Sequence, residues 1–186
     1  MKLLTPENSP ISRRMHLTLL VMCVLAIATA LIPSASGADM NVAGLVVDYG
    51  DGRMSYALVP FAEEEINGIE LLRRSGLGLV TVGFGGMGDA VCQIENTGCP
   101  VDDCRRRLCQ TSDPESPFWR YLRQTAPGDW EFLALGASGA SVEDGDIDGW
   151  SWTGTEASLP SLTMDEVAER AGANATLLAA SDAPSA

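Results

Sequence analysis

The chain has 186 residues, enough for one domain of ordinary size, and its 25 acidic residues outnumber its 12 lysines and arginines. The resulting formal charge of −13 repels phosphate backbones, so the composition argues against nucleic-acid binding. The single histidine, His16, and the single lysine, Lys2, both lie near the N-terminus. The rest of the chain therefore cannot support Ser-His-Asp, Cys-His or lysine-based covalent catalysis.

Residues 1–38 have the pattern of an export signal peptide. Arg13 and Arg14 form a positive region, an apolar stretch follows at 17–32, and small residues at 34–38 provide a cleavage site. The apolar stretch is shorter than the roughly 20 residues that a membrane-spanning helix needs. We therefore expect a secreted or extracytoplasmic protein, which would contact a membrane only if the signal stays uncleaved. The rest of the chain has nine arginines and 24 acidic residues.

The first half of the predicted domain, which spans 39–154, begins with a β-hairpin. Residues 42–48 and 54–61 are strand-like and flank an Asp-Gly turn. Residues 62–74 predict a helix, because acids open this segment and arginines close it, as suits the helix dipole. Two further strands are expected at 77–84 and 90–94, and they are joined by a glycine-rich turn.

Four cysteines follow the predicted signal peptide: Cys92, Cys99, Cys104 and Cys109. An even number of cysteines in an exported domain indicates two disulfides, and the sequence leaves all three pairings open. A metal site is the alternative, although these cysteines lack close C-x-x-C spacing and a histidine to assist. Residues 95–117 have little apolar surface, so we expect a loop that the disulfides hold in place.

Two aromatic-rich strands are expected at 118–122 and 130–135, and residues 141–152 should close the domain with an acidic turn and a short strand. The C-terminal extension, 155–186, should hold a short helix at 164–171 and then a disordered tail. A hairpin, one helix and several strands predict an α+β fold, in which the helix covers one face of a mixed sheet.

The acidic turn carries Asp144, Asp146 and Asp148 at alternate positions, with a glycine at the sixth place. This arrangement is similar to the opening of a calcium-binding loop, but the twelfth position is Thr155 instead of glutamate. Two interpretations stay open: a calcium site in a structural or adhesive surface domain, and a glycine-stabilised turn whose acids face water. No pair of carboxylates stands out as catalytic, so we expect no enzyme.

Six aromatic residues come in pairs spaced two apart, a spacing that places both rings of a pair on one face of a strand. If the strands are neighbours, the rings form one aromatic wall, which serves either as core or as a binding surface. The pairs are Trp119 and Tyr121, Trp130 and Phe132, and Trp150 and Trp152.

Four segments carry a resemblance to a known family: 47–52, 67–72, 118–121 with Trp130, and 142–150. Together they resemble the transcobalamin C-terminal-like family of exported bacterial domains, and the resemblance covers about residues 40–154. It rests on the order and spacing of an early hairpin, a helix, and late aromatic strands. This chain differs from the family in having an inserted cysteine loop and no helical cobalamin-binding partner domain.

The resemblance implies a β-grasp fold, in which a sheet curls around one helix, and ligand binding without catalysis. In transcobalamin the related domain closes over one face of a corrinoid. By that likeness we expect capture of a small soluble ligand, with a corrinoid among the options, or of an extracytoplasmic partner protein. No resident cofactor is expected. The candidate ligand-binding residues are Phe84, Trp119, Tyr121 and Trp150.

Overall fold

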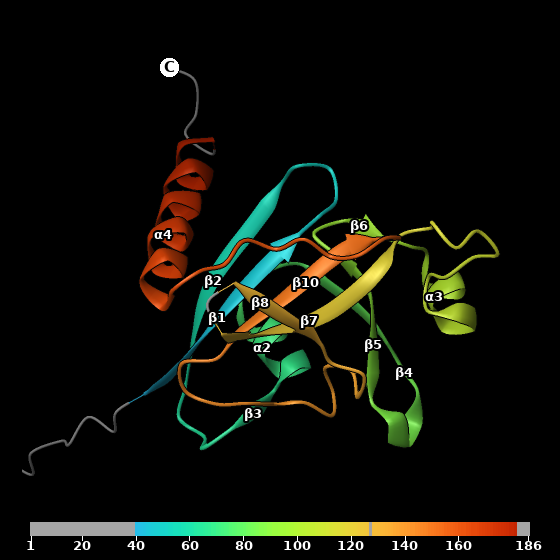
Figure 1. Ribbon diagram of the computed structural model, residues 1–186, viewed down its shortest axis with the longest axis horizontal. Coiled ribbons are helices and arrows are strands. Elements are labelled where there is room, and N and C mark those ends of the chain that lie inside the picture. Colours follow the sequence, from blue (N-terminus) through green and yellow to red (C-terminus); the bar gives the residue numbers. More distant parts are fainter. Residues whose placement is uncertain (1–39, 127, 182–186) are drawn as a thin grey trace, which may run out of the picture. The chain divides into compact units, whose positions relative to one another are not determined.

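The computed structural model describes residues 40–126 and 128–181, and it describes side chains over 40–125 and 128–172. The expected export signal lies outside the described residues, as do the last five residues of the chain. The described part has an α+β fold that is rich in strands, as predicted (Figure 1). None of its helices combines the length and the hydropathy needed to cross a membrane.

The main sheet has five strands in the order β2-β1-β10-β7-β8. All neighbours in this sheet are antiparallel except β1 and β10, which are parallel. The strand that comes last in the chain therefore lies in the middle of the sheet, between β1 and β7 (Figure 1). The strand bounds are Asn41–Asp48 for β1, Met54–Phe61 for β2, Phe118–Ala126 for β7, Asp129–Phe132 for β8 and Ile147–Thr153 for β10.

The predicted hairpin is confirmed, with Asn41 opposite Phe61 and Asp48 opposite Met54. Its turn contains Gly50 with a φ of 73°, a conformation that glycine adopts without steric cost. A Cβ on Gly50 would lie 2.4 Å from the carbonyl oxygen of Trp152, so the turn also packs closely against β10.

The helix expected at 62–74 is shorter than predicted. Helix α2 spans Gly68–Arg74, and it is preceded by the short strand β3 (Ile66–Asn67), which pairs with β9 (Ser141–Val142). The helix begins late because the Asn67 side chain accepts a hydrogen bond from the Glu70 amide and caps its N-terminus. A Cβ on Gly68 would lie 2.1 Å from the hydroxyl oxygen of Tyr121, so only glycine fits the first helical position.

The main core lies between the five-stranded sheet and α2. It combines residues of β1, such as Leu45 and Val47, with Ile69, Leu71 and Leu72 of the helix. These positions are 0–2% exposed, so burial of this apolar surface is a major contribution to the stability of the domain.

A second, three-stranded antiparallel sheet contains the two strands predicted around the glycine-rich turn. It has the order β4-β5-β6, and the 3-10 turn η1 lies between β4 and β5. The bounds are Leu79–Gly83 for β4, Gly85–Met87 for η1, Asp89–Ile94 for β5 and Thr97–Gly98 for β6.

The prediction of an irregular loop over 95–117 is wrong in its middle, where helix α3 spans Val101–Arg107. Acids in its first turn and arginines in its last turn favour this helix. Its apolar signal is weak in the sequence because Cys104 is its only buried residue.

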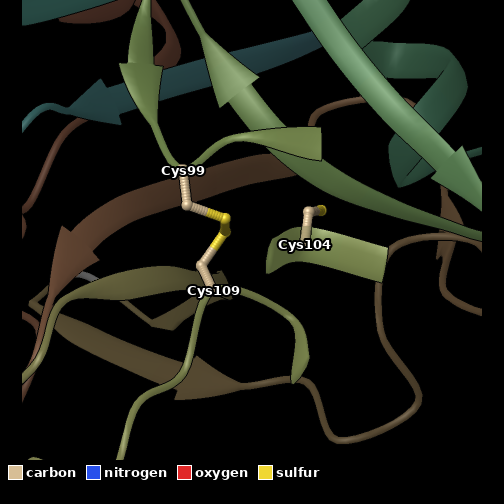
Figure 2. A group of neighbouring side chains, drawn as sticks. All are labelled: Cys99, Cys104 and Cys109. Atoms are coloured by element: carbon tan, nitrogen blue, oxygen red, sulfur yellow. A yellow bond between two sulfur atoms is a disulfide. The ribbon is translucent and has the colours of Figure 1, made fainter. Parts of the chain in front are cut away.

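The four cysteines form two disulfides, Cys92–Cys104 and Cys99–Cys109, so the prediction of disulfides is confirmed and the pairing is assigned. Figure 2 shows the Cys99–Cys109 bond with the side chain of Cys104 beside it. The sulfur atoms of Cys99, Cys104 and Cys109 lie within 4.8 Å of one another. Because all of them are oxidised here, the cysteines attach α3 to β5 and β6 and do not act as thiolate ligands.

The opposite face of the main sheet is covered by residues 157–167, which end in helix α4 (Met164–Ser181). Leu159, Leu162 and Val167 pack there against Val46 and Leu122 of the sheet. Helix α4 is longer than the predicted 164–171, and it includes residues 172–181, where the sequence suggested a disordered tail. Burial of its first turns against β1 and β2 gives the helix a support that local sequence signals did not reveal.

Replacing both Cys92 and Cys104 by alanine should lower the free energy of unfolding by about 3 kcal/mol, because the bond closes a short loop and restricts the unfolded chain. Urea denaturation of the wild type and of the double variant measures this loss. Intact-mass analysis of the wild type should show no free thiol among these four cysteines. Four free thiols in a folded domain of unchanged stability would contradict the assignment.

Candidate functional site

Two of the three predicted aromatic pairs lie side by side on the α2 face of the main sheet. In the register of β10 and β7, Trp150 lies opposite Tyr121 and Trp152 opposite Trp119. The ring centroids are 4.8 Å apart for the first of these pairs and 5.3 Å apart for the second. Tyr49 extends the group, with its ring 6.3 Å from Trp119. These rings form a continuous aromatic wall.

The third pair does not join this wall. Trp130 lies opposite Gln124 in the ladder and packs with Leu122 on the other face of the sheet. Its indole nitrogen donates to the carbonyl of Pro160. Phe132 is 52% exposed at the end of β8. The two-residue spacing was a correct signal for one shared face in the pairs of β7 and β10. It was wrong for β8, where Trp130 packs on the far face and Phe132, at the end of the strand, contributes to the cavity on the α2 face.

The aromatic wall lines a cavity of about 240 Å³. Trp119, Tyr121 and Trp150 contribute to its lining, as do β5 and the segment 132–137. Its rim includes Leu108 and Phe132, whose side chains are 48% and 52% exposed. Large apolar side chains at the rim of an aromatic cavity are typical of a site that takes an apolar ligand.

The structure does not place Phe84, the fourth candidate residue, in this cavity. Phe84 packs instead with Val82 against the disulfide cluster. The glycine-rich turn next to it approaches another part of the chain: a Cβ on Gly88 would lie 2.3 Å from the Cβ of Ser138. The expected close approach of backbone therefore occurs, but within the chain.

Sequence analysis missed the cavity residues that lie outside strands. Leu108 reaches the rim because it ends α3 in the left-handed conformation, with a φ of 54°. Ala134 and Ala137 belong to an irregular segment after β8. Small residues in such a segment carry no periodic signal, so only the tertiary structure brings them to the cavity.

Behind the cavity, Tyr121 takes part in a buried polar network. Its hydroxyl donates to Asp148, a residue with no exposed surface. The Nε of Arg123 donates to the same carboxylate at 2.7 Å, and its Nη1 lies 3.2 Å from Asp146. Burial raises the pKa of Asp148, and the guanidinium of Arg123 opposes that rise. Burial and the carboxylate of Asp148 also raise the pKa of Tyr121, which keeps the phenol protonated as a donor.

The aspartates of the acidic turn that suggested calcium have partners within the chain. The carboxylate of Asp144 accepts from the Val42 amide at 2.7 Å, and that of Asp146 accepts from the Glu143 amide at 2.9 Å. Asp148 lies within β10 and faces the core. Within the part of the chain that the structure describes, the three aspartates do not form a group close enough to hold a metal ion.

Two indole nitrogens of the wall, those of Trp119 and Trp150, are buried and have no hydrogen-bond partner within the described residues. An unpaired buried donor costs about 1–3 kcal/mol relative to a hydrogen-bonded one. Because protein encloses both nitrogens, a ligand in the cavity would contact carbon atoms of the rings and not these donors.

No protein-family model matches the chain, and no curated protein matches it.

Changing Asp148 to asparagine should lower the free energy of unfolding by about 2–3 kcal/mol, because the variant leaves Arg123 without its buried counter-charge. Chemical denaturation measures the loss. Asp146→Asn is the matched control, since this side chain is 29% exposed, and it should cost less than about 1 kcal/mol. Equal losses in the two variants would show that Asp148 has no special place in the core.

Proposed function

We propose that this protein is an exported, non-catalytic binding module whose aromatic cavity captures a small apolar ligand. The observation that carries the proposal is the cavity of about 240 Å³, which is lined by Trp119, Tyr121 and Trp150. These rings belong to the core and are only 3–9% exposed, so a ligand would touch the small part of each ring that reaches the cavity. Apolar contact there would give affinity for an apolar group without any specific chemistry.

The cavity's dimensions and charge define the ligand class. Ligand pockets usually range over about 300–1,000 Å³, so this cavity suits a ligand of about one ring. The only charged side chain in its lining is Asp89, which already pairs with Arg73. A neutral ligand is therefore favoured over an ion, whose charge would find no free partner there.

A corrinoid would use the same wall in a different way. Its macrocycle is much larger than the cavity, so only one edge could enter while the rest lay on Leu108 and Phe132 at the rim. We therefore propose a smaller ligand as the main occupant, and we include cobalamin in the binding test below.

The β-grasp assignment and the export of the protein belong to the same proposal. The mixed sheet with α2 packed against one face supports a β-grasp-like arrangement. The two disulfides support an oxidising compartment such as the periplasm or the cell exterior. Together with the resemblance to transcobalamin C-terminal-like domains, they favour a role in ligand capture outside the cytoplasm.

Titration with p-cresol, a one-ring neutral probe, tests the cavity. In a two-dimensional NMR spectrum, the indole N–H signals of Trp119 and Trp150 should shift in a saturable manner, because aromatic ring currents act over a few ångströms. The signal of Trp130 should not shift, since this residue lies on the other face of the sheet. Cobalamin, titrated in parallel, should give weaker shifts at the same signals.

Ala134→Phe provides the matching variant, since this exposed alanine lines the cavity and a phenyl ring can occupy the space from its rim. We expect it to weaken p-cresol binding by at least about tenfold, or about 1.4 kcal/mol. Ala62→Phe changes an exposed alanine outside the cavity and should leave binding unchanged. Absence of saturable shifts at Trp119 and Trp150, with either probe, would reject the proposal.

A further inference from the structure

Strand β2 is the outer strand of the main sheet, and one side of its backbone has no partner. The hairpin is closed by a hydrogen bond from the Tyr49 amide to the Arg53 carbonyl. In an antiparallel ladder, hydrogen-bonded pairs alternate with non-bonded pairs, so Met54, Tyr56 and Leu58 direct their amide and carbonyl groups away from β1. Among the described residues, none forms a hydrogen bond with these outward groups.

A groove of about 670 Å³ runs along this edge of the sheet. Residues 53–58 form its base. One wall consists of Ser75, Gly76 and Leu77, which follow α2, and Ala171 of α4 contributes to the other. Figure 1 shows α4 alongside β2. The groove is therefore bounded from both faces of the sheet, as a slot for one more strand would be.

Over residues 54–58, the edge carries no charge, bulge or proline that would prevent strand addition. Exposed edge strands commonly carry inward-pointing charges, bulges or prolines. Strand β2 contains no charged residue, its register with β1 is unbroken over all eight pairs, and Leu58 is 36% exposed. Its one proline, Pro60, lies beyond the groove and has no amide hydrogen to offer.

We propose that the β2 edge binds an extended segment of a partner protein as a sixth strand, and that this segment has an uncharged middle and basic ends. Residues 54–58 span about 17 Å, the length of five extended residues. The uncharged middle matches β2, and main-chain hydrogen bonds to Tyr56 and Leu58 would supply affinity. This site is separate from the aromatic cavity and does not depend on the proposed ligand.

Charge selects the partner. Residues 39–186 hold nine arginines against 24 acids, a balance of −15. Two charged residues line the groove, and one of them, Arg53, already pairs with Asp51 at 2.8 Å. The other, Glu95, forms no ion pair with any described residue, and neither do the exposed Glu64 and Glu65, which follow β2 beyond the groove. A basic segment is attracted to this surface, whereas a second copy of the same chain is repelled. If two copies paired through their β2 edges, the α4 helix of one copy would meet the α4 helix of the other, because α4 borders the groove.

The probe is an eight-residue peptide of alternating threonine and valine with a lysine at each end, blocked at both termini. Fluorescence anisotropy should show saturable binding to the full chain without its signal peptide. Hydrogen exchange of the Tyr56 and Leu58 amides should slow by at least about tenfold in the complex, because both would become bonded. A peptide with glutamates in place of the lysines should bind at least about tenfold more weakly.

Leu58→Pro removes one outward amide and leaves the bonds to β1 intact, as Pro60 already does two residues later. It should weaken binding by at least about tenfold, whereas Leu58→Thr, which keeps the amide, should stay within about threefold. N-methylation of alternate peptide residues should abolish binding to the wild type, a test that does not depend on the folding of a variant.

Unchanged p-cresol shifts in Leu58→Pro would show that the domain and its cavity are intact, so the two sites are tested separately. The proposal is overturned by no binding of the lysine peptide, by equal binding of the N-methylated peptide, or by protection at residues outside β2. Protection of Tyr56 and Leu58 that rises with protein concentration alone would identify a second copy as the occupant, and would also overturn it.

Discussion

The buried carboxylate of Asp148 determines how the central strand is placed. A charge without exposed surface is tolerated only with close partners, and Tyr121 and Arg123 of β7 supply them. Asp148, Trp150 and Trp152 alternate along β10 and so share one face, while Gly149 and Ser151 lie on the other. A slip of one residue would put the carboxylate on the wrong face and remove both tryptophans from the α2 core.

The aromatic cavity follows from this register. With Trp150 opposite Tyr121, the two rings are close enough to form one wall, and the Tyr121 hydroxyl reaches both Asp148 and the start of α2. Gly68, at the start of α2, leaves room for this hydroxyl. A Cβ on Gly68 would also lie 3.1 Å from the Cβ of Ala137, so α2, β7 and the irregular segment after β8 meet at this point. The cavity is thus bounded on one side by strands whose positions are fixed and on the other by an irregular segment.

Local patterns in the sequence were sufficient for the hairpin, the cysteine chemistry and the two-residue aromatic spacing. They could not reveal the parallel pairing of β1 with β10, because Gly44 and Ile147 are partners about a hundred residues apart and no local signal encodes such contacts. The same limit explains the unexpected helix around Cys104, which tertiary disulfides support, and the position of Phe84 beside those disulfides instead of in the cavity. Aromatic residues were recognised correctly by type and spacing, but their faces depended on strand order.

Tyr49 connects the aromatic wall to the edge groove. Its ring contacts Trp119 of the aromatic wall, and the same residue lines the groove along β2. Tyr49 is only 3% exposed; its hydroxyl donates to Ser55 at 3.0 Å, and the guanidinium of Arg53 lies over its ring at 4.6 Å. Contacts on several sides hold the ring in one position, so a strand added outside β2 can form its main-chain bonds without moving it. The groove and the cavity have no lining residue in common, so an added strand and a cavity ligand would not compete for the same side chains, and we expect the two sites to be occupied independently.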